Sequence, residues 1–295
     1  DIVRRSELFD AEWYLSENKD VRRKGMDPAI PYLHFGANEG RDPSPHFSTL
    51  AYRDAYLKDG RNPVYHWETE GRSQGLSDPP LFPGMLEREN GIPTVLAFAH
   101  LAGETLFGAE RSFLDMLDRL LDEGLSPVTV LPSHRNEAYF QAVRERSAAV
   151  YVMPQKWRRI GHDPAPAIIK RLRQLIADLA PSAVHVNTIV LDAPLLAARA
   201  QSVRSVVHVR ELPVQDSELG ILLGGSPEAI RKALLEQADH FIANSPDVAE
   251  WLDIPDRVEL VLNRIDASLF ELAFQPGEEL RVAMISSNGR KKGVE

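Results

Sequence analysis

Glycine and polar residues follow the predicted strands of this chain at the points where the strands end. A short apolar run, residues 94–100, leads into the loop Gly103 to Arg111 and then into an amphipathic helix. The helix is expected to begin near Gly108 and Ala109, so its unpaired N–H groups and positive dipole end face the space beyond the strand. This arrangement suits an anionic or polyhydroxylated ligand.

Further strand ends carry residues that could bind or act on such a ligand. They are the loop of residues 154–162, the pair Asn187 and Thr188, the run from His208 to Arg210 and Glu211, and the pair Asn244 and Ser245. In an open parallel sheet the ligand lies beyond the carboxyl ends of the strands, which makes these the predicted binding positions. Each signal is unspecific by itself, because the glycine loop lacks the dinucleotide spacing and a strand histidine more often packs in a core.

The elements that must position these residues alternate from Thr94 onward. Strands are expected over 94–100, 127–132, 149–153, 183–187, 204–209, 240–244 and 257–262, and helices over 108–123, 136–146, 165–179, 191–201, 227–237 and 246–252. Strand and helix alternation predicts an α/β fold, a doubly wound parallel sheet of Rossmann-like type with helices on both faces.

An internal repeat organises the N-terminal part. Residues 28–47 and 63–82 align at an offset of 35, pairing Gly36 with Gly71 and Phe47 with Phe82. We expect a small helical module of two copies over residues 1–78, followed by a linker rich in proline and glycine over 79–93. Its many aromatic side chains should mostly fill the interior, whereas an exposed aromatic row would indicate a carbohydrate-binding surface.

Composition excludes several classes of protein. The 295 residues, 43% hydrophobic and 26% charged, suffice for two domains, and the net charge of -9 argues against a general nucleic-acid binder. Without cysteine there is no disulfide and no thiolate metal site, and we assign no metal ligands. The most apolar window, residues 183–200, is interrupted by polar and charged residues, so no membrane span is expected.

One basic loop stands out on this acidic chain. Lys156, Arg158 and Arg159 flank Trp157, and further cations follow on the next predicted helix. A solvated basic surface explains the pattern without a ligand. The functional alternative is a peripheral contact with an anionic membrane surface or a phosphate-bearing lipid carrier, at the cytoplasmic face.

Several segments together resemble the group 1 family of retaining glycosyltransferases. They are residues 108–114, 122–124, 128–132, 184–188, 206–212, 238–245, 261–270, 281–285 and 291–293. The resemblance implies a GT-B fold of two Rossmann-like domains, with residues 94–275 as the acceptor-binding domain and 276–295 as the start of a truncated donor-binding domain. It also implies transfer with retention and no obligatory metal or other cofactor. The N-terminal repeat is similar to modules fused ahead of bacterial glycosyltransferases.

The resemblance implies roles for individual residues. Catalytic roles near the reacting sugar fall to Arg210, Glu211 and His208, and substrate or phosphate binding falls to Gly108, Ala109, Glu110, Arg111, Asn187, Ser245 and Lys292. The chain departs from the family pattern at Arg210, where histidine is common, and at Arg264. The implied partners are a nucleotide sugar and a carbohydrate or lipid-linked acceptor of bacterial polysaccharide or glycoconjugate assembly.

Two alternatives remain open at this stage. A non-catalytic carbohydrate- or protein-interaction module would use the repeats for binding and the sheet as a scaffold. Another Rossmann-type enzyme, such as an epimerase or oxidoreductase, is disfavoured by the glycine spacing and by the lack of a Tyr-x-x-x-Lys pair. If the glycosyltransferase reading holds, the donor site lies mainly beyond Glu295, and this chain alone should be inactive. Residues 212–225 are expected to form a mobile connection near the acceptor.

Overall fold

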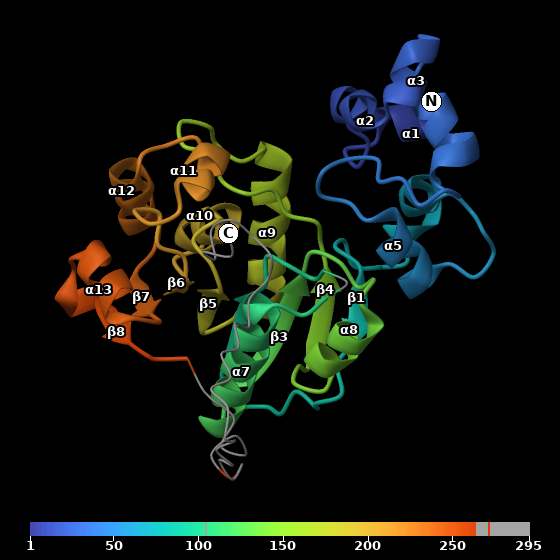
Figure 1. Ribbon diagram of the computed structural model, residues 1–295. Helices are drawn as coiled ribbons and strands as arrows, with labels where there is room; N and C mark the ends of the chain where they lie inside the picture. The colour runs from blue at the N-terminus through green and yellow to red at the C-terminus, as the bar shows by residue number, and fades with distance from the viewer. Residues whose placement is uncertain (104, 264–270, 272–295) are drawn as a thin grey trace, which may run out of the picture.

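The α/β domain is built on one sheet with an almost entirely parallel arrangement (Figure 1). The computed structural model describes residues 1–103, 105–263 and 271. The strands are β1 (Leu81–Pro83), β2 (Thr94–Phe98), β3 (Ser126–Leu131), β4 (Ala149–Val152), β5 (Ala183–Val186), β6 (Arg204–Val209), β7 (His240–Ala243) and β8 (Val258–Leu260). Their order is β1-β4-β3-β2-β5-β6-β7-β8, and every pair is parallel except β1 with β4. The predicted Rossmann-like α/β fold is confirmed.

Helices cover both faces of this sheet. They are α7 (Gly108–Asp122), α8 (Glu137–Arg144), α9 (Pro166–Leu179), α10 (Ala193–Ala200), α11 (Ser217–Leu223), α12 (Pro227–Gln237) and α13 (Pro246–Leu252). Leu96 and Phe98 of β2 share one core with α9 and α10, while Ala97 shares the other core with Phe113 of α7 and Phe140 of α8. Alternate residues of a strand point to opposite faces, so a strand buried on both sides reads as a continuous apolar run.

The N-terminal module consists of short helices around aromatic side chains. They are α1 (Ile2–Arg5), α2 (Ala11–Glu17), α3 (Lys19–Lys24), α4 (Ala29–Pro31), α5 (Thr49–Tyr56) and α6 (Pro63–His66), with π-helical turns over Tyr32–Gly36 and Trp67–Gly71. A Cβ on Gly36 would lie 2.3 Å from the hydroxyl oxygen of Tyr14, and one on Gly71 would lie 2.6 Å from that of Tyr52. Each copy of the repeat therefore needs glycine where a tyrosine from an earlier helix, α2 or α5, packs against its π-helical turn.

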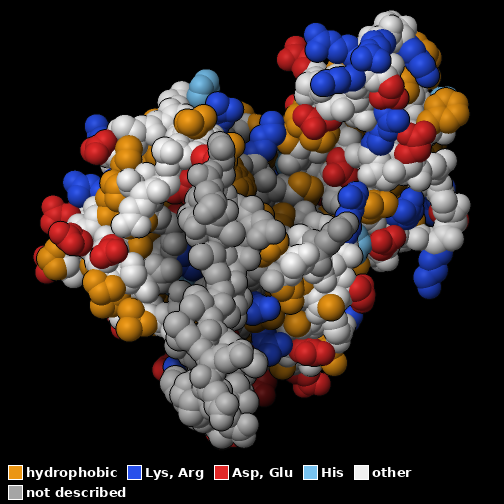
Figure 2. All heavy atoms as spheres, viewed as in Figure 1, with side chains coloured by type: hydrophobic (Ala, Val, Ile, Leu, Met, Phe, Trp, Pro, Cys, Tyr) orange, Lys and Arg blue, Asp and Glu red, His pale blue; other side chains and the backbone are white. Residues whose placement is uncertain are grey.

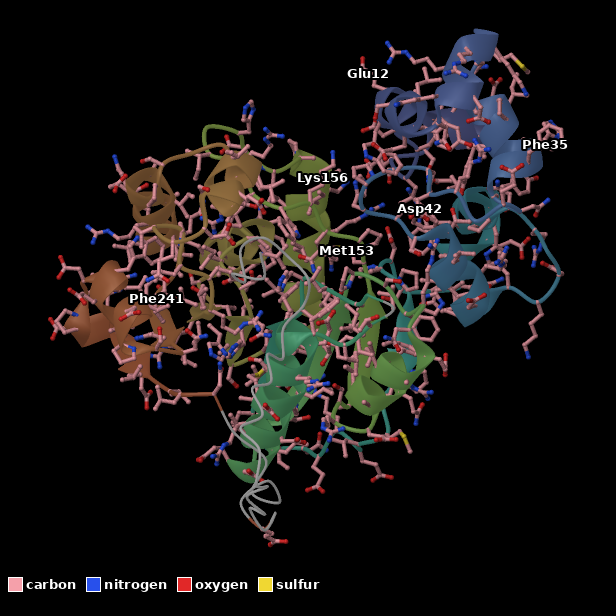
Figure 3. All side chains as sticks on the ribbon, in the orientation of Figure 1. Glu12, Phe35, Asp42, Met153, Lys156 and Phe241 are labelled. Carbon is pink, nitrogen blue, oxygen red and sulfur yellow. The ribbon has the colours of Figure 1, made fainter. Side chains whose placement is uncertain are left out.

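Of the ten Phe, Tyr and Trp side chains in residues 1–78, five are buried, three are half-buried and two are exposed. Tyr14, Tyr32 and Tyr52 are completely buried, whereas Phe35 is 66% exposed and points outward in Figure 3. Tyr65 is also exposed, but it borders a different hollow from Phe35. The described residues of the module thus show no exposed aromatic row, and the aromatic residues mainly pack its core.

The segment expected as a linker, 79–93, contributes the edge strand β1. Its neighbour Gly84 lies so close to β4 that an added Cβ would be 1.8 Å from the carbonyl oxygen of Ser147. The backbone N–H of Leu81 donates to the hydroxyl of Tyr56 in the module, at 2.9 Å. Arg171 of α9 and Asp78 form a largely buried ion pair at 2.9 Å. The segment therefore attaches the module to the α/β domain through direct contacts.

A helix also lies within residues 212–225, where a mobile connection was expected. The Asp216 side chain accepts a hydrogen bond from the N–H of Leu219, and Gly224 ends α11 with a φ of 70°. Leu219 and Leu223 are buried in the core. The predicted strand near residues 280–285, the proposed start of a second domain and Lys292 lie outside the described residues.

Candidate functional site

The carboxyl ends of β2, β5 and β6 meet at the N-terminus of α7. Arg210, which follows β6, donates from Nε to the carbonyl oxygen of Asn187 at 3.2 Å and from Nη1 to that of Gly108 at 3.5 Å. Asn187 follows β5, and Gly108 is the first residue of α7. Three predicted site residues from distant parts of the sequence are therefore in direct contact.

Asn187 is held tightly at this junction. Its side chain is almost completely buried, its backbone N–H donates to the Phe98 carbonyl at 3.1 Å, and its Nδ2 donates to the Ala109 carbonyl at 3.4 Å. The side-chain oxygen Oδ1 is buried without a partner among the described residues. Asn187 therefore joins the end of β5 to the end of β2 and to the start of α7.

Glu211 uses its carboxylate to shape the turn that follows β5. Its Oε1 accepts from the Thr188 hydroxyl at 2.7 Å, and its Oε2 accepts from the backbone N–H groups of Ile189 at 3.3 Å and Arg210 at 3.2 Å. These bonds fix the loop that carries Asn187. In this structure Glu211 is a positioning residue for the site.

Glu110 holds the loop that precedes α7 through hydrogen bonds to its backbone. This residue is 1% exposed, and its carboxylate accepts from the N–H of Phe107 at 3.1 Å and from that of Gly103 at 3.5 Å. A Cβ on Gly108 would meet no atom within 4 Å, so the space above the helix start is open. The Arg111 side chain is exposed on the first turn of α7. The first N–H groups of a helix have no partner within the helix and can face a ligand in such a space.

His208 lies in the sheet and is not part of the Arg210 junction. Its ring packs 6.3 Å from that of His185 in β5, and its two ring nitrogens have no partner among the described residues. Burial lowers the pKa of His208 to about 3, with repulsion from His185 and Arg210 acting in the same direction. Burial alone lowers the pKa of His185 to about 4. Both rings are therefore neutral at physiological pH.

Ser245 lies farther along the same edge of the sheet. Its hydroxyl accepts a hydrogen bond from the N–H of Val248 at 3.3 Å and caps α13. This contact gives Ser245 a role in starting the helix. The described residues place it in no contact with Arg210.

His100 lies at this edge of the sheet, although it was not among the predicted site residues. It stands two residues after the end of β2, and its ring centroid lies 6.1 Å from that of Trp157. Burial lowers the pKa of His100, while the negative charges of Glu211 and Glu110 oppose that change. Its position at the carboxyl end of the first strand was the signal that could have identified it.

The position of Arg158 contradicts the prediction that this residue contacts a membrane surface. It is 2% exposed, its backbone N–H donates to the Val190 carbonyl at 2.7 Å, and Nη2 donates to the Leu191 carbonyl at 3.4 Å. Arg158 therefore points inward and cannot reach a membrane surface. Lys156 and Arg159 remain exposed.

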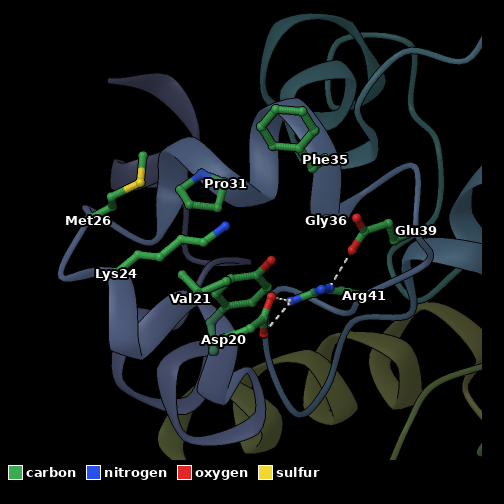
Figure 4. Close-up of a pocket in the computed structure, with 10 residues that line it drawn as sticks. Asp20, Val21, Lys24, Met26, Pro31, Phe35, Gly36, Glu39 and Arg41 are labelled. Atoms are coloured by element: carbon green, nitrogen blue, oxygen red, sulfur yellow. Dashed lines mark hydrogen bonds and ion pairs between the residues drawn. The ribbon is translucent and has the colours of Figure 1, made fainter.

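The module carries a hollow of its own, about 280 Å³ in volume, around Phe35 and Arg41 (Figure 4). The Arg41 guanidinium is already paired with Asp20 at 2.9 Å and with Glu39 at 2.6 Å. Phe35 is the exposed aromatic ring of this hollow. The guanidinium of the hollow is thus already paired within the module, while Lys24 is a second cation that lines it.

Two negative findings apply to the described part of the chain. Within residues 1–103 and 105–263, no helix is long and apolar enough to cross a membrane. The same residues contain no cluster of three or more histidine or carboxylate side chains that could hold a metal ion.

Comparison with known proteins identifies a sequence family. Residues 107–263 match the family described as the glycosyl transferase 4-like domain. The comparison with curated protein sequences gives no match.

Several solved structures align with part of this chain. The Anabaena protein HepE in complex with UDP has 16% identity and a TM-score of 0.43, covering 61% of this chain and 46% of its own. A UDP-N-acetylglucosamine 2-epimerase has 14% identity and a TM-score of 0.42, with coverage of 57% and 48%. Acinetobacter baumannii MurG has 16% identity and a TM-score of 0.39, with coverage of 62% and 50%. The aligned part is about half the length of each of these proteins.

Proposed function

The chain belongs to the family of glycosyl transferase 4-like domains, and we propose that it is the acceptor-binding half of a nucleotide-sugar-dependent retaining glycosyltransferase. The donor would be a nucleoside diphosphate sugar, and the acceptor a polysaccharide, glycolipid or other glycoconjugate. The donor-binding half would be a second Rossmann-like domain facing the carboxyl edge of this sheet.

The junction of Arg210, Asn187 and Gly108 carries the proposal. Breaking the bond between the sugar's anomeric carbon and the diphosphate leaves negative charge on the departing oxygen. Arg210 is held by two carbonyl oxygens at 3.2 and 3.5 Å, and it lies beside the N-terminus of a 15-residue helix. A fixed guanidinium and a helix N-terminus stabilise developing negative charge most strongly when a second domain excludes water.

The other residues of the site would orient the substrates. Asn187 would act indirectly, because its side chain is buried and its Nδ2 holds the Ala109 carbonyl at the start of α7. His100, kept neutral by burial, offers one donor and one acceptor at the same edge. Glu211 would act indirectly, because its carboxylate already holds the turn of Thr188 and Ile189.

The test measures glycosyl transfer by the chain joined to its donor-binding domain, using a panel of nucleotide sugars and acceptors. We expect Arg210→Met to lower kcat by roughly 10²- to 10³-fold, the usual cost of losing one charge-stabilising group. Arg210→Lys should recover part of the loss. Arg204→Met, a change at an exposed arginine at the start of β6, is the matched control and should leave kcat unchanged.

An unchanged kcat in Arg210→Met, with the fold intact by circular dichroism, would overturn this assignment. The 295-residue chain without the donor half should show no turnover and weak donor binding, because its phosphate contacts would remain in bulk water. Tight binding of a nucleotide sugar by this chain alone would contradict the division into acceptor and donor halves.

A further inference from the structure

A polar hollow lies where the N-terminal module meets the α/β domain, and it is separate from the Arg210 junction. Figure 2 shows the surface hollowed between these two parts, and Figure 3 labels Lys156 on the side that faces the module. Its volume is about 370 Å³, within the range of small-molecule sites. The module contributes Asp10 and His46, the loop after β4 contributes residues 155–159 and 162–165, and Asp192 comes from the start of α10.

Two polar side chains of this hollow have buried atoms without partners among the described residues. They are Arg158 at Nε and Nη1 and Gln155 at both amide atoms. His46 is also buried, and one of its ring nitrogens donates to the Glu7 backbone. Arg158 is 2% exposed and His46 is 5% exposed. Buried polar atoms in native proteins almost always have a protein, water or ligand partner, so these atoms are available to a polar ligand that enters the hollow.

The charge of Arg158 identifies part of that ligand. Burial lowers the pKa of Arg158 to about 10, which leaves the guanidinium protonated at neutral pH. Asp192 and Glu211 attract it from a distance, yet Arg158 forms no ion pair within the described residues. Burying a cation without a close counterion costs free energy. A carboxylate or phosphate oxygen of a ligand would supply that counterion and accept hydrogen bonds from Nε and Nη1.

The remaining groups suit hydroxyls and the face of a sugar ring. Burial lowers the pKa of His46 to about 4, so its ring is neutral; one ring N–H donates to the Glu7 backbone, and the other nitrogen remains an acceptor. The amide of Gln155 likewise donates and accepts, and the carboxylate of Asp192 accepts. Trp157 borders the hollow with a ring that is 37% exposed, a surface on which an apolar sugar face can pack.

We propose that this hollow binds a saccharide unit bearing an acid group, with Arg158 on the carboxylate or phosphate and with Gln155 and His46 on the hydroxyls. Naming this unit as part of the acceptor rests on the proposed function, but binding itself does not require transfer. The hollow is close to the transfer site, because Trp157 lies 6.1 Å from His100 at the end of β2. The module would then select acceptors by their charge.

Isothermal titration calorimetry on the 295-residue chain tests the proposal. The probes are methyl glucuronide, glucose 1-phosphate, methyl glucoside and inorganic phosphate. We expect saturable binding of one or both acidic sugars at one site per chain, with at least 10-fold weaker binding of the neutral glucoside. The better of the two acidic sugars distinguishes a carboxylate from a phosphate. Equal affinity for inorganic phosphate would overturn the saccharide assignment, and no binding by either acidic sugar would overturn the site.

Variants separate a binding role of Arg158 from a structural one. Arg158→Met should weaken acidic-sugar binding by about 10- to 100-fold, the range for losing a charged hydrogen bond. It should leave the melting temperature almost unchanged, since two of the three removed nitrogens are unpartnered and the third, Nη2, makes only a long hydrogen bond of 3.4 Å to the Leu191 carbonyl. Gln155→Glu should weaken binding through repulsion with the fold intact, and Arg173→Met, at an exposed arginine of α9, is the control. A lower melting temperature with unchanged binding in Arg158→Met would overturn the proposal. Failure of transfer in the extended chain would leave this binding result unaffected.

Discussion

The histidine pair in the sheet should make the chain sensitive to acid. His185 and His208 lie side by side on adjacent strands, with ring centroids 6.3 Å apart. Their folded-state pKa values are about 4 and about 3, below the ordinary value of 6.5. The unfolded chain therefore binds protons more readily than the folded chain as the pH falls through 6.5. The stability that the neutral rings contribute is complete above pH 6.5 and is lost progressively down to about pH 3.

The size of this loss of stability follows from the pKa of histidine in the unfolded chain. At pH 5 each ring is mostly protonated in the unfolded state and still neutral in the folded state. Each histidine should then lower the free energy of unfolding by about 2 kcal/mol between pH 8 and pH 5. This magnitude barely depends on the folded pKa, provided that it lies well below 5.

Urea unfolding at pH 8 and pH 5 measures the effect in the variant His208→Leu. Leucine cannot be protonated, and the two ring nitrogens that it removes have no partner. The loss of stability from pH 8 to pH 5 should be smaller by about 2 kcal/mol in the variant than in the parent chain. Other groups, including Asp42, whose pKa burial raises to about 6, contribute equally to both chains and cancel in the difference.

His34→Leu is the control, because the ring of His34 is exposed. Between pH 8 and pH 5 its free energy of unfolding should fall by as much as that of the parent chain. If His208→Leu also loses as much as the parent chain between pH 8 and pH 5, His208 is accessible to protons in the folded state, and the reasoning from its burial fails.

Two further predictions concern the attachment of the module. Arg171→Met should lower the free energy of unfolding by about 3–5 kcal/mol, because it leaves the buried carboxylate of Asp78 unpaired. Urea unfolding should show a smaller loss in the double variant Arg171→Met with Asp78→Asn, because the uncharged amide needs no counterion. Equal losses of unfolding free energy in the single and the double variant would contradict the pairing. Gly84→Ala should separate β1 from β4, because its Cβ would lie 1.8 Å from the Ser147 carbonyl. Limited proteolysis should then cut within residues 79–93, and unchanged resistance would refute this account.

The parallel strands were predictable because both of their faces are buried. An apolar run such as residues 94–98 has no other place in a folded chain, and the amphipathic segments between such runs supply the helices that cover them. The strand β1 was missed because only three residues pair, in a segment dominated by turn-forming residues. The helix α11 was missed because the glycines in residues 212–225 were taken to indicate a mobile connection. Asp216 and Gly224 are nevertheless typical of the start and end of a helix.

The candidate site was predictable only where topology determines it. Parallel strands place their carboxyl ends along one edge, so Asn187 and Arg210 had to lie near each other once the sheet existed. Which functional groups remain free was not predictable from residue type. Glu211 and Glu110 are carboxylates of the expected kind, yet both accept bonds from the protein's own backbone.

The basic loop shows why charge in a sequence does not determine exposure. Residues 156–159 form one short run, but Arg158 is buried and Arg159 is exposed. The difference arises because Arg158 bonds to carbonyl oxygens of residues 190 and 191, beside a hollow whose other side is formed by His46 of the module. That side exists only when a segment more than a hundred residues earlier packs against the α/β domain. The burial of Arg158 therefore depends on tertiary contacts that the sequence of residues 156–159 does not reveal. Its unpartnered atoms Nε and Nη1 are the groups that we propose bind the ligand.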